Sequence, residues 1–440
     1  MRKILLLASV FALVDTEAQN YFVSTVGGNG TAGLVDGLAT TAAELNYPYG
    51  LTYDGDTVIY FSDSNNHAIR KLSSNTHLIT TIAGGAGAGL QDGIGSAAKF
   101  NHPDGVFYKN GYVYVGDNMN NCIRMVNVVT HSVTTVAGTG VAGYVNGPAA
   151  SAQFKGGNGI DVVVDNNGDI YVADGSNAVI RKISNGQVSL YAGTPGVYGY
   201  VDGPVASAKF HRPRYMALDT ATGDLYISDI NNNVIRKVSG GVVSTFSGTG
   251  ITGGQDGPPN VATFSAPVGI AITYGGYLYV VDGGGNKLRK LDPSGNVTTI
   301  AGNGTFGFQD GAASIAEFDY PQGVCYDKHC YIYMADRDNN RIRSVRVPEG
   351  PAGCNFANVN EMEFYQFSLY PNPSAGIVHF DNGGSSEPVN YAVTDFLGKL
   401  VKQGNVENSK IDISELENGA YLITFRQSGQ SFNRKLVLQK

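Results

Sequence analysis

The chain contains 440 residues with a formal net charge of −7 at pH 7, and only 15% of its residues are charged. Glycine is unusually frequent, at 59 residues, alongside 26 tyrosines and no tryptophan. Many glycines without a collagen triplet period predict tight turns between short aromatic strands, which argues against a mostly helical fold. The acidic balance gives no electrostatic reason to expect a nucleic acid or an anionic membrane as partner.

The first residues have the features of a secretory signal peptide. Arg2 and Lys3 give a positive start, and an apolar run follows from Ile4 to Val14. We expect a signal peptide over residues 1–18, with cleavage after Ala18. The apolar run is shorter than the roughly 20 residues of a membrane-spanning helix, and no later segment comes closer. The sequence therefore predicts no membrane-spanning segment.

One nine-residue segment recurs six times along the chain. A glycine-rich segment such as TIAGGAGAGLQDG and an F-x-x-P-x-G segment recur in phase with it. The copies of the first segment, from DSNNHAIRK to DRDNNRIRS, begin at Asp63, Asp117, Asp174, Asp229, Asp282 and Asp336, at intervals of 53 to 57 residues. Short alternating runs such as DLYISD lie between these markers, so each period predicts four strands joined by turns. A four-stranded unit at this period is typical of a propeller blade, and six periods predict six blades.

The two ends of the repeat region complement each other. The chain opens on a strand of the fourth type, VSTV at residues 23–26, whereas the final repeat stops after its third strand at Val347. We therefore expect an all-β fold with a six-bladed β-propeller over residues 21–349, closed by the N-terminal strand. Closure of this kind removes a free sheet edge.

The repeated residues resemble a known family. The D-x-x-N-x-x-I-R-K strand pair, the AG-x-G-x-x-G-x-x-DG linker and the F-x-x-P-x-G segment look like those of the NHL-repeat six-bladed propeller, over residues 21–349. The resemblance implies the fold. It implies no single function, because the same propeller occurs in lyases, RNA-binding proteins and scaffold proteins.

The chain changes character after the repeats. Residues 350–364 read as a linker, and residues 365–440 alternate again with new turns, as in YPNPSAG, DFLGK, LENGAY and the terminal KLVLQK. These phrases resemble the C-terminal sorting domain of the type IX secretion system. About seven short strands there predict a small, Ig-like β-sandwich. The resemblance implies the type IX secretion machinery as a partner and a protein that is secreted or attached to the outer surface of a Gram-negative bacterium.

Export places the four cysteines in an oxidising compartment. Cys325 and Cys330 flank a short turn, so we expect a cross-strand disulfide between them. Cys122 stands where other repeats have small apolar residues, which predicts a buried thiol. Cys354, in the linker, has no assigned partner.

Residues copied in every repeat are more typical of architecture than of a unique site. We expect the six repeated aspartates to cap turns, the arginines that follow them to pair between blades, and the Asp-Gly pairs of the linkers to form turns. Calcium would need carboxylates spaced as in a calcium-binding loop, and zinc would need histidines in register. The repeats supply neither, so we expect no metal and no cofactor.

Positions that break the repeat are better candidates for a ligand site. They lie at the start of the first strand of each repeat, nearest the predicted central channel. The candidate ligand-binding residues are Tyr47, Tyr49, His102, Asp104, Asn158, His211, Arg212, Arg214, Tyr320 and Gln322. One repeat alone offers Arg212 and Arg214 together, and a cluster of Arg, His and Tyr suits a carboxylate or a sugar.

The preferred function is therefore a monomeric, non-catalytic module that binds an extracellular glycan, peptide or protein. The alternative is an extracellular lyase or hydrolase with a metal-assisted site in the central channel. His102 and His211 lie at different offsets from the following proline, and no G-x-S-x-G segment occurs, so no catalytic residue is assigned. RNA binding would need a basic face, which the acidic repeat region does not predict.

Overall fold

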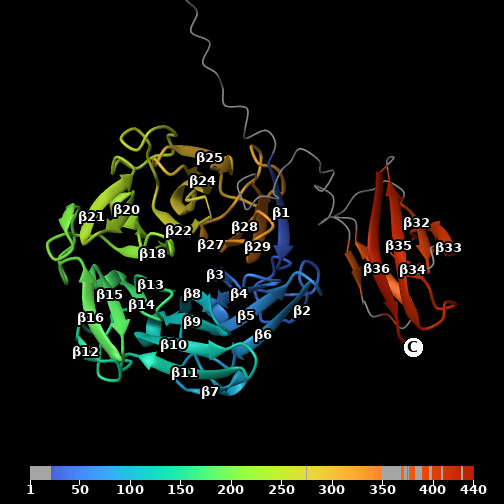
Figure 1. The fold of residues 1–440 in the computed structure, drawn as a ribbon, viewed down its shortest axis with the longest axis horizontal. Coiled ribbons are helices and arrows are strands. Elements are labelled where there is room, and N and C mark those ends of the chain that lie inside the picture. Colours follow the sequence, from blue (N-terminus) through green and yellow to red (C-terminus); the bar gives the residue numbers. More distant parts are fainter. Residues whose placement is uncertain are drawn as a thin grey trace, which may run out of the picture. The chain divides into compact units, whose positions relative to one another are not determined.

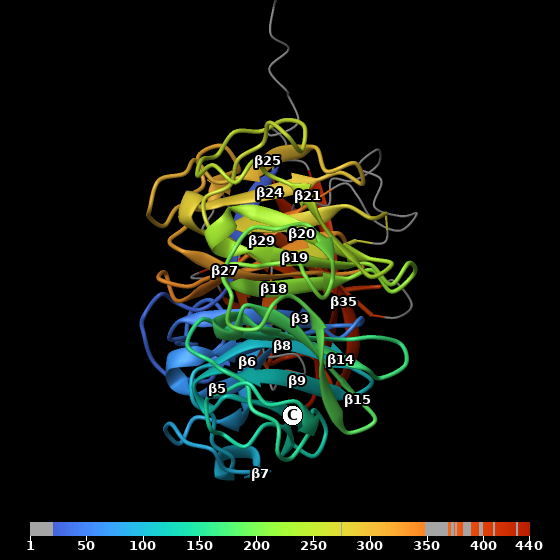
Figure 2. The same ribbon diagram turned by 90° about the vertical axis from the view of Figure 1, so that its left-hand side faces the viewer.

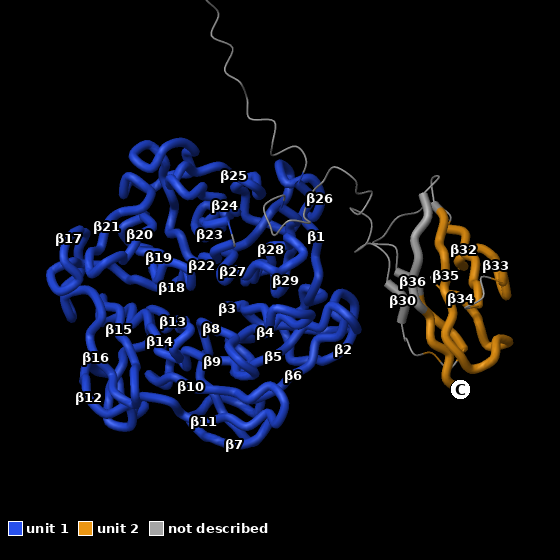
Figure 3. The backbone as a smooth tube through the Cα atoms, in the orientation of Figure 1, with its two compact units in different colours: residues 1–354 blue, residues 355–440 orange. Residues whose placement is uncertain are grey.

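The computed structural model describes residues 21–273, 275–347, 368–370, 374, 376–381, 389–395, 399–407, 410–427 and 430–440. The chain divides into two compact units, Met1–Cys354 and Asn355–Lys440 (Figure 3). The predicted signal peptide with its cleavage site at Ala18, the predicted linker over residues 350–364, and Cys354 lie outside the described residues.

The described residues of the first unit form antiparallel sheets arranged in a ring (Figure 1). We name each sheet by its innermost strand and give its strands from the centre outward. The β3 sheet has β3 (Pro48–Tyr53), β4 (Val58–Asp63), β5 (Ala68–Ser73), β6 (Leu78–Gly84) and β2 (Gly37–Leu38); the β8 sheet has β8 (Pro103–Lys109), β9 (Tyr112–Asp117), β10 (Cys122–Asn127), β11 (Ser132–Ala137) and β7 (Gly93–Ile94). The β13 sheet has β13 (Ile160–Val164), β14 (Ile170–Asp174), β15 (Val179–Ser184), β16 (Gln187–Ala192) and β12 (Gly147–Pro148); the β18 sheet has β18 (Pro213–Leu218), β19 (Leu225–Asp229), β20 (Val234–Ser239), β21 (Val242–Ser247) and β17 (Gly203–Pro204). The β22 sheet has β22 (Pro267–Ile272), β23 (Leu278–Asp282), β24 (Lys287–Leu291) and β25 (Val297–Ala301); the β27 sheet has β27 (Pro321–Tyr326), β28 (Tyr331–Asp336), β29 (Arg341–Arg346), β1 (Phe22–Gly27) and β26 (Gly311–Ala312).

The ring closes on itself. The inner strands pack against one another in chain order, and β27 returns to pack against β3. The strands β18, β3 and β8 lie in the middle of the unit when it is turned by 90° (Figure 2). Strand β1 pairs with β29, with Val23 opposite Val345 and Ser24 opposite Ser344. The N-terminal strand therefore completes the sheet that the last repeat leaves unfinished, which is the pairing that the sequence predicts.

Glycine allows the inner strands to approach one another closely. A Cβ atom at Gly50 would lie 2.5 Å from the carbonyl oxygen of Asp104 on the next sheet, and one at Gly323 would lie 2.2 Å from that of Tyr49. Real Cβ atoms do not tolerate such distances, so the last residue of the F-x-x-P-x-G segment is glycine wherever neighbouring backbones meet. The β18 sheet departs from this pattern, because Tyr215 stands at the equivalent position.

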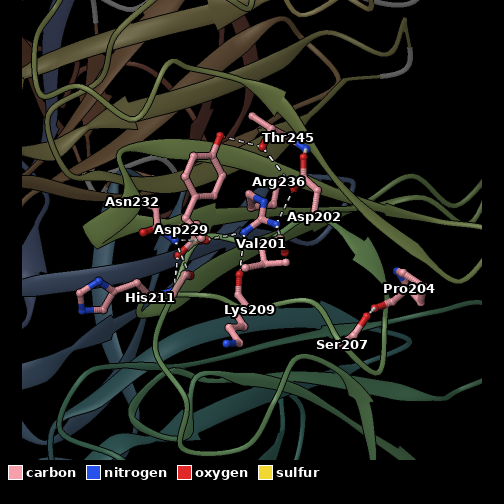
Figure 4. Close-up of polar contacts among 12 residues, drawn as sticks. Val201, Asp202, Pro204, Ser207, Lys209, His211, Asp229, Asn232, Arg236 and Thr245 are labelled. Atoms are coloured by element: carbon pink, nitrogen blue, oxygen red, sulfur yellow. Dashed lines mark hydrogen bonds and ion pairs between the residues drawn. The ribbon is translucent and has the colours of Figure 1, made fainter.

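Each sheet contains one fully buried arginine that fastens the long glycine-rich linker to it. In the β18 sheet, Nη1 of Arg236 lies 2.8 Å from Asp229, and Nη2 lies 2.6 Å from Asp202 in the linker (Figure 4). Asp202 also accepts hydrogen bonds from the backbone and side chain of Thr245, while Arg236 stacks 5.1 Å from the ring of Phe210. The equivalent arginines are Arg70, Arg124, Arg181, Arg236, Arg289 and Arg343. The charge of each buried arginine is thus hydrogen-bonded, as the low polarity of the protein interior requires.

These contacts correct two expectations from the sequence. The repeated aspartates precede short 3-10 turns, η2 (Ser64–Asn66), η4 (Asn118–Asn120), η5 (Gly175–Asn177), η6 (Ile230–Asn232) and η7 (Gly283–Gly285), with η3 (Gly95–Ala97) in a linker. Asp229 makes no capping bond to the turn after it and instead accepts from the backbone N–H of His211. The arginines pair within their own sheet rather than between blades, because the linker aspartate belongs to that same sheet.

The described part of the second unit forms two antiparallel sheets. One contains β30 (Ser368–Tyr370), β31 (Ile377–Asp381) and β34 (Lys410–Asp412); the other contains β33 (Leu400–Asn405), β32 (Asn390–Thr394), β35 (Gly419–Gln427) and β36 (Gln430–Leu438). Val378 and Ile411 from the first sheet share one hydrophobic core with Val393, Ile423 and Phe425 from the second.

The predicted disulfide between Cys325 and Cys330 is wrong. Cys325 lies on β27 opposite Tyr333, is buried in a hydrophobic core beside Leu51, and is a free thiol. Cys330 is disulfide-bonded and lies in the turn before β28, with a left-handed φ of 69°. The two residues are therefore neither cross-strand partners nor bonded to each other. Cys122 is a buried free thiol, as expected.

Candidate ligand-binding site

The proline of the F-x-x-P-x-G segment opens most of the inner strands, and the two residues that flank it differ from repeat to repeat. We call the residues after the proline, or after Gly157, which replaces it in the β13 sheet, the floor positions: Tyr49, Asp104, Asn158, Arg214, Val268 and Gln322. We call the residues before it the rim positions: Tyr47, His102, Gly156, Arg212, Ala266 and Tyr320. The floor positions are buried or half-buried, whereas the rim positions are half-buried, with Tyr320 exposed at 41%. Together with Arg337 they form what we call the entrance cluster.

The floor is held together by a contact between sheets that are not neighbours. Arg214 on β18 lies 3.3 Å from both carboxylate oxygens of Asp104 on β8. The hydroxyl of Tyr215 donates to Asp104 over 2.7 Å, and the ring of Tyr49 lies 5.2 Å from the Arg214 guanidinium. Although burial opposes its charge, Asp104 raises the pKa of Arg214. This buried ion pair joins the β8 and β18 sheets past the β13 sheet that lies between them.

A cavity of about 190 Å³ is lined by the inner strands, and Tyr215 and Asp161 contribute to its wall. Oδ2 of Asp161 accepts the backbone N–H of Met216 over 2.8 Å. Burial, with a smaller contribution from the charge of Asp104, raises the pKa of Asp161 well above its ordinary value. Burial likewise raises the pKa of Tyr215. Floor positions such as Tyr49, Asp104 and Arg214 do not line the cavity.

The rim residues adopt a backbone conformation that L-residues rarely take. Their φ angles are 56° at Tyr47, 48° at His102, 68° at Arg212, 51° at Ala266 and 45° at Tyr320. Positive φ is strained for residues with a Cβ atom, and the following proline restricts the backbone further. Asparagines of the preceding sheet hold the strained backbone: Oδ1 of Asn340 accepts the N–H of Tyr47, and Asn286 accepts that of Tyr320. Ala266 has the same conformation, so the strained backbone is a property of the fold. Only the side chains at the rim positions vary.

A histidine replaces asparagine in one of these contacts. Nδ1 of His67 accepts the backbone N–H of His102 over 3.2 Å, and the two rings meet edge to face with centroids 4.7 Å apart. Burial and the neighbouring His102 lower the pKa of His67. The neutral form of His67 is required, because a protonated Nδ1 cannot accept a hydrogen bond.

Three tyrosines surround Arg337. Its guanidinium lies 5.3 Å from the ring of Tyr47, 5.9 Å from Tyr49 and 4.9 Å from Tyr320. Asp338 pairs with it over 2.7 Å, and Nη1 also donates to the Tyr49 hydroxyl over 3.4 Å. Tyr49 thus lies between Arg337 and Arg214.

Arg212 has no such partner. Its Nε donates to the carbonyl oxygen of Asn158 over 3.4 Å, and among the described residues no carboxylate forms an ion pair with it. Burial and the positive charge of Arg214 lower the pKa of Arg212. A cation in this environment gains from an anionic neighbour.

The structure brings together most of the residues that the sequence singled out. The members of the entrance cluster among them are Tyr47, Tyr49, His102, Asp104, Asn158, Arg212, Arg214, Tyr320 and Gln322. His211 instead contacts Tyr198 and Asn231. Sequence reasoning missed Tyr215, Asp161 and Arg337 as members of the site. Tyr215 carries a readable signal, because it replaces the repeated glycine, and Arg337 stands where other repeats have Ser, Asn, Gly or Ile.

Within the described residues, no three His, Cys, Asp or Glu side chains are grouped so that they could hold a metal ion. The described residues also contain no helix that is long and apolar enough to cross a membrane.

Comparison with known proteins supports both units. Residues 368–439 match the family described as the secretion system C-terminal sorting domain. The chain is 26% identical over 341 residues to NHL repeat-containing protein 2 of Homo sapiens, covering 68% of this chain and 46% of that protein. The chain spans less than half the length of the first curated relatives that it matches.

Two solved structures from Bacteroides thetaiotaomicron share the fold. A structural genomics protein has a TM-score of 0.58 at 23% identity, covering 74% of this chain and 76% of its own. An auxiliary nutrient binding protein has a TM-score of 0.56 at 17% identity, with the same coverage. The fold and these likenesses define an NHL-type β-propeller protein. This chain joins such a propeller to a C-terminal sorting domain of the type IX secretion system, which indicates secretion or attachment at the outer cell surface.

Proposed function

We infer that the chain is a secreted or surface-attached binding module. Its six sheets are the blades of a six-bladed propeller closed by the N-terminal strand, and the sorting domain is a small β-sandwich. The ligand, an extracellular glycan, peptide or protein, contacts the propeller at the entrance cluster. The auxiliary nutrient binding protein that shares the fold supports a binding role.

The variation among the rim and floor positions carries this proposal. Five of the six repeats share one rim backbone with positive φ, yet Tyr, His, Arg, Asp and Gln side chains replace one another at the rim and floor positions. Two buried polar atoms of the floor, Nε of Arg214 and Oε1 of Gln322, have no hydrogen-bond partner within the described part of the chain. The Nε atoms of Arg70, Arg124, Arg181 and Arg236 lack partners in the same way, so the atom that is specific to the floor is Oε1 of Gln322. Buried polar groups without partners are rare in native proteins, so a ligand or water that supplies the missing hydrogen bond to Gln322 is expected there.

The experiment is a screen of the mature chain, residues 19–440, against extracellular polysaccharides and peptides, with affinity measured by calorimetry. A triple variant, Tyr47→Ala, Arg212→Ala and Tyr320→Ala, tests the rim without straining the fold, because Ala266 already occupies the equivalent position. The matched control, Lys109→Ala, Tyr112→Ala and Tyr277→Ala, likewise removes one cation and two tyrosines, near the opposite ends of the inner strands.

Binding that the rim variant abolishes and the control retains is the expected result. Binding that both variants retain, or no binding at all, would contradict the proposal. Product analysis of the bound polysaccharides also tests the alternative function, an extracellular lyase or hydrolase, which stays a prediction.

A further inference from the structure

We propose that the entrance cluster recognises a carbohydrate that carries a carboxylate, with Arg212 as the residue that binds the carboxylate. This inference rests on the proposed binding function and names the chemical class of its ligand. Three independent features of the cluster support it: an arginine without a carboxylate partner, the partnerless buried Oε1 of Gln322, and an aromatic surface.

One cation of the cluster has no carboxylate partner among the described residues. Arg214 is paired with Asp104 and Arg337 with Asp338, which leaves Arg212 as a third guanidinium without a carboxylate partner among the described residues. A planar guanidinium binds a carboxylate through two parallel hydrogen bonds, and partial burial strengthens the interaction. An anionic group of the ligand therefore matches Arg212 better than a neutral one does.

The partnerless acceptor of the floor calls for a ligand with a hydrogen-bond donor. Gln322 is 3% exposed, its Oε1 has no partner among the described residues, and its amide nitrogen donates to the carbonyl oxygen of Tyr320. A hydroxyl group of a sugar can donate the missing hydrogen bond.

Aromatic side chains continue from the floor to the surface. The ring of Tyr320 lies 5.2 Å from that of Phe306, which is 53% exposed on the linker between the β22 and β27 sheets. Tyr47 and Tyr49 face the same guanidinium as Tyr320. Exposed aromatic surface beside polar groups marks an interaction site, and rigid rings suit the flat apolar faces of sugar rings.

An acidic peptide would also satisfy Arg212, but it is the less favoured ligand. Its side chains carry carboxylates without neighbouring hydroxyls, so the buried Oε1 of Gln322 would depend on a backbone N–H for its missing hydrogen bond. A sugar acid brings the carboxylate, the hydroxyls and the apolar ring face within one residue.

The test measures binding of the mature chain to three probes of equal length: a tetramer of galacturonic acid, a tetramer of galactose and a glutamate tetrapeptide. Three variants use residues that other repeats already carry: Arg212→Ala, Gln322→Val and Arg337→Ser. Lys109→Ala serves as the charge-matched control, since Lys109 ends β8 at the opposite end of the sheet.

We expect the acidic sugar to bind, more weakly at high salt because a charged contact is screened. Arg212→Ala should lower its affinity about 10- to 100-fold, the effect of losing a charged hydrogen bond, while Lys109→Ala leaves it unchanged. Gln322→Val should lower affinity for the sugar. Arg337→Ser, which removes the cation around which the three tyrosines gather, should also lower it.

Two other results are distinguishable. Stronger binding of the neutral sugar or of the peptide, still sensitive to the rim variant, would overturn the ligand class and keep the binding function. If Arg212→Ala and Lys109→Ala weaken binding of the acidic sugar equally, both the ligand class and the binding function at the entrance cluster are overturned.

Discussion

The guanidinium of Arg214 lies 3.3 Å from the carboxylate of Asp104, although a third sheet separates the two sheets that carry them. Both side chains are buried, and Tyr215 donates a further hydrogen bond to the same carboxylate. The pair therefore joins two sheets that are not neighbours in the ring, at the floor of the entrance cluster.

Asp104→Ala should destabilise the propeller by about 3–5 kcal/mol, because it leaves Arg214 charged, buried and unpaired. Asp56→Ala is the control: its carboxylate pairs with Lys328 but is 75% exposed, and such surface pairs contribute about 0–1 kcal/mol. Urea unfolding of the two variants measures the difference. Equal losses of stability would show that the Arg214–Asp104 contact does not hold the ring together.

His67→Asn should reduce the loss of stability in mild acid. The pKa of His67 is lowered in the folded state, so the unfolded chain takes up the proton first, and stability falls as the pH drops below about 6.5, the unperturbed value. The stabilisation is complete above that pH and is lost down to the folded pKa. Asparagine makes the same contact in the other sheets without titrating.

The control for this change is His131→Asn. His131 also has a left-handed backbone, with φ of 59°, but it makes no contact with a rim residue. Thermal unfolding between pH 5 and pH 8 should show a flatter profile for His67→Asn alone. An unchanged profile for that variant would refute a titrating contact between the β3 and β8 sheets.

The cysteines should differ in their reactivity toward alkylating reagents. Burial raises the pKa of the Cys122 and Cys325 thiols, which makes them poor nucleophiles in the folded protein. Alkylation of the native, non-reduced chain should leave both unlabelled, and alkylation after denaturation should label both. Peptide mapping should find Cys330 in a disulfide. A Cys325–Cys330 linked peptide would contradict the structure.

Removing residues 368–440 should retain the protein in the periplasm, because the segment contains the sorting domain and the predicted signal peptide would direct export only across the inner membrane. Cell fractionation of the host with an antibody to the propeller measures this. A truncated chain that still appears in the medium or on the cell surface would argue that the sorting domain is not needed for outer-membrane passage.

The sequence predicts the sheets well because the repeat is long and local. Asp63, Asp117 and their equivalents end the second strand of each sheet, where the repeated segment begins. The glycine excess likewise marks the linkers that Asp202 and its counterparts attach to the sheets. Contacts between distant repeats could not be predicted in this way, because no local sequence pattern relates Asp104 to Arg214.

The candidate site was therefore predicted as a set of positions rather than as an arrangement. Departures from the repeat identified Arg212, Arg214 and Tyr320, because the fold makes each repeat a reference for the others. The same comparison could have found Tyr215 and Arg337, which also depart from their equivalents. Asp161 could not be found in this way: its importance comes from its burial next to Tyr215, which depends on how the β13 and β18 sheets pack.

The most direct measurement is a crystal structure of the mature chain soaked with the galacturonic acid tetramer. We predict a sugar carboxylate within hydrogen-bond distance of the Arg212 guanidinium and a sugar hydroxyl at Oε1 of Gln322. The Tyr320 side chain should lie against a sugar ring. A tetramer bound at full occupancy elsewhere, such as on the outer edge of the sheets, while the entrance cluster is empty, would contradict this proposal.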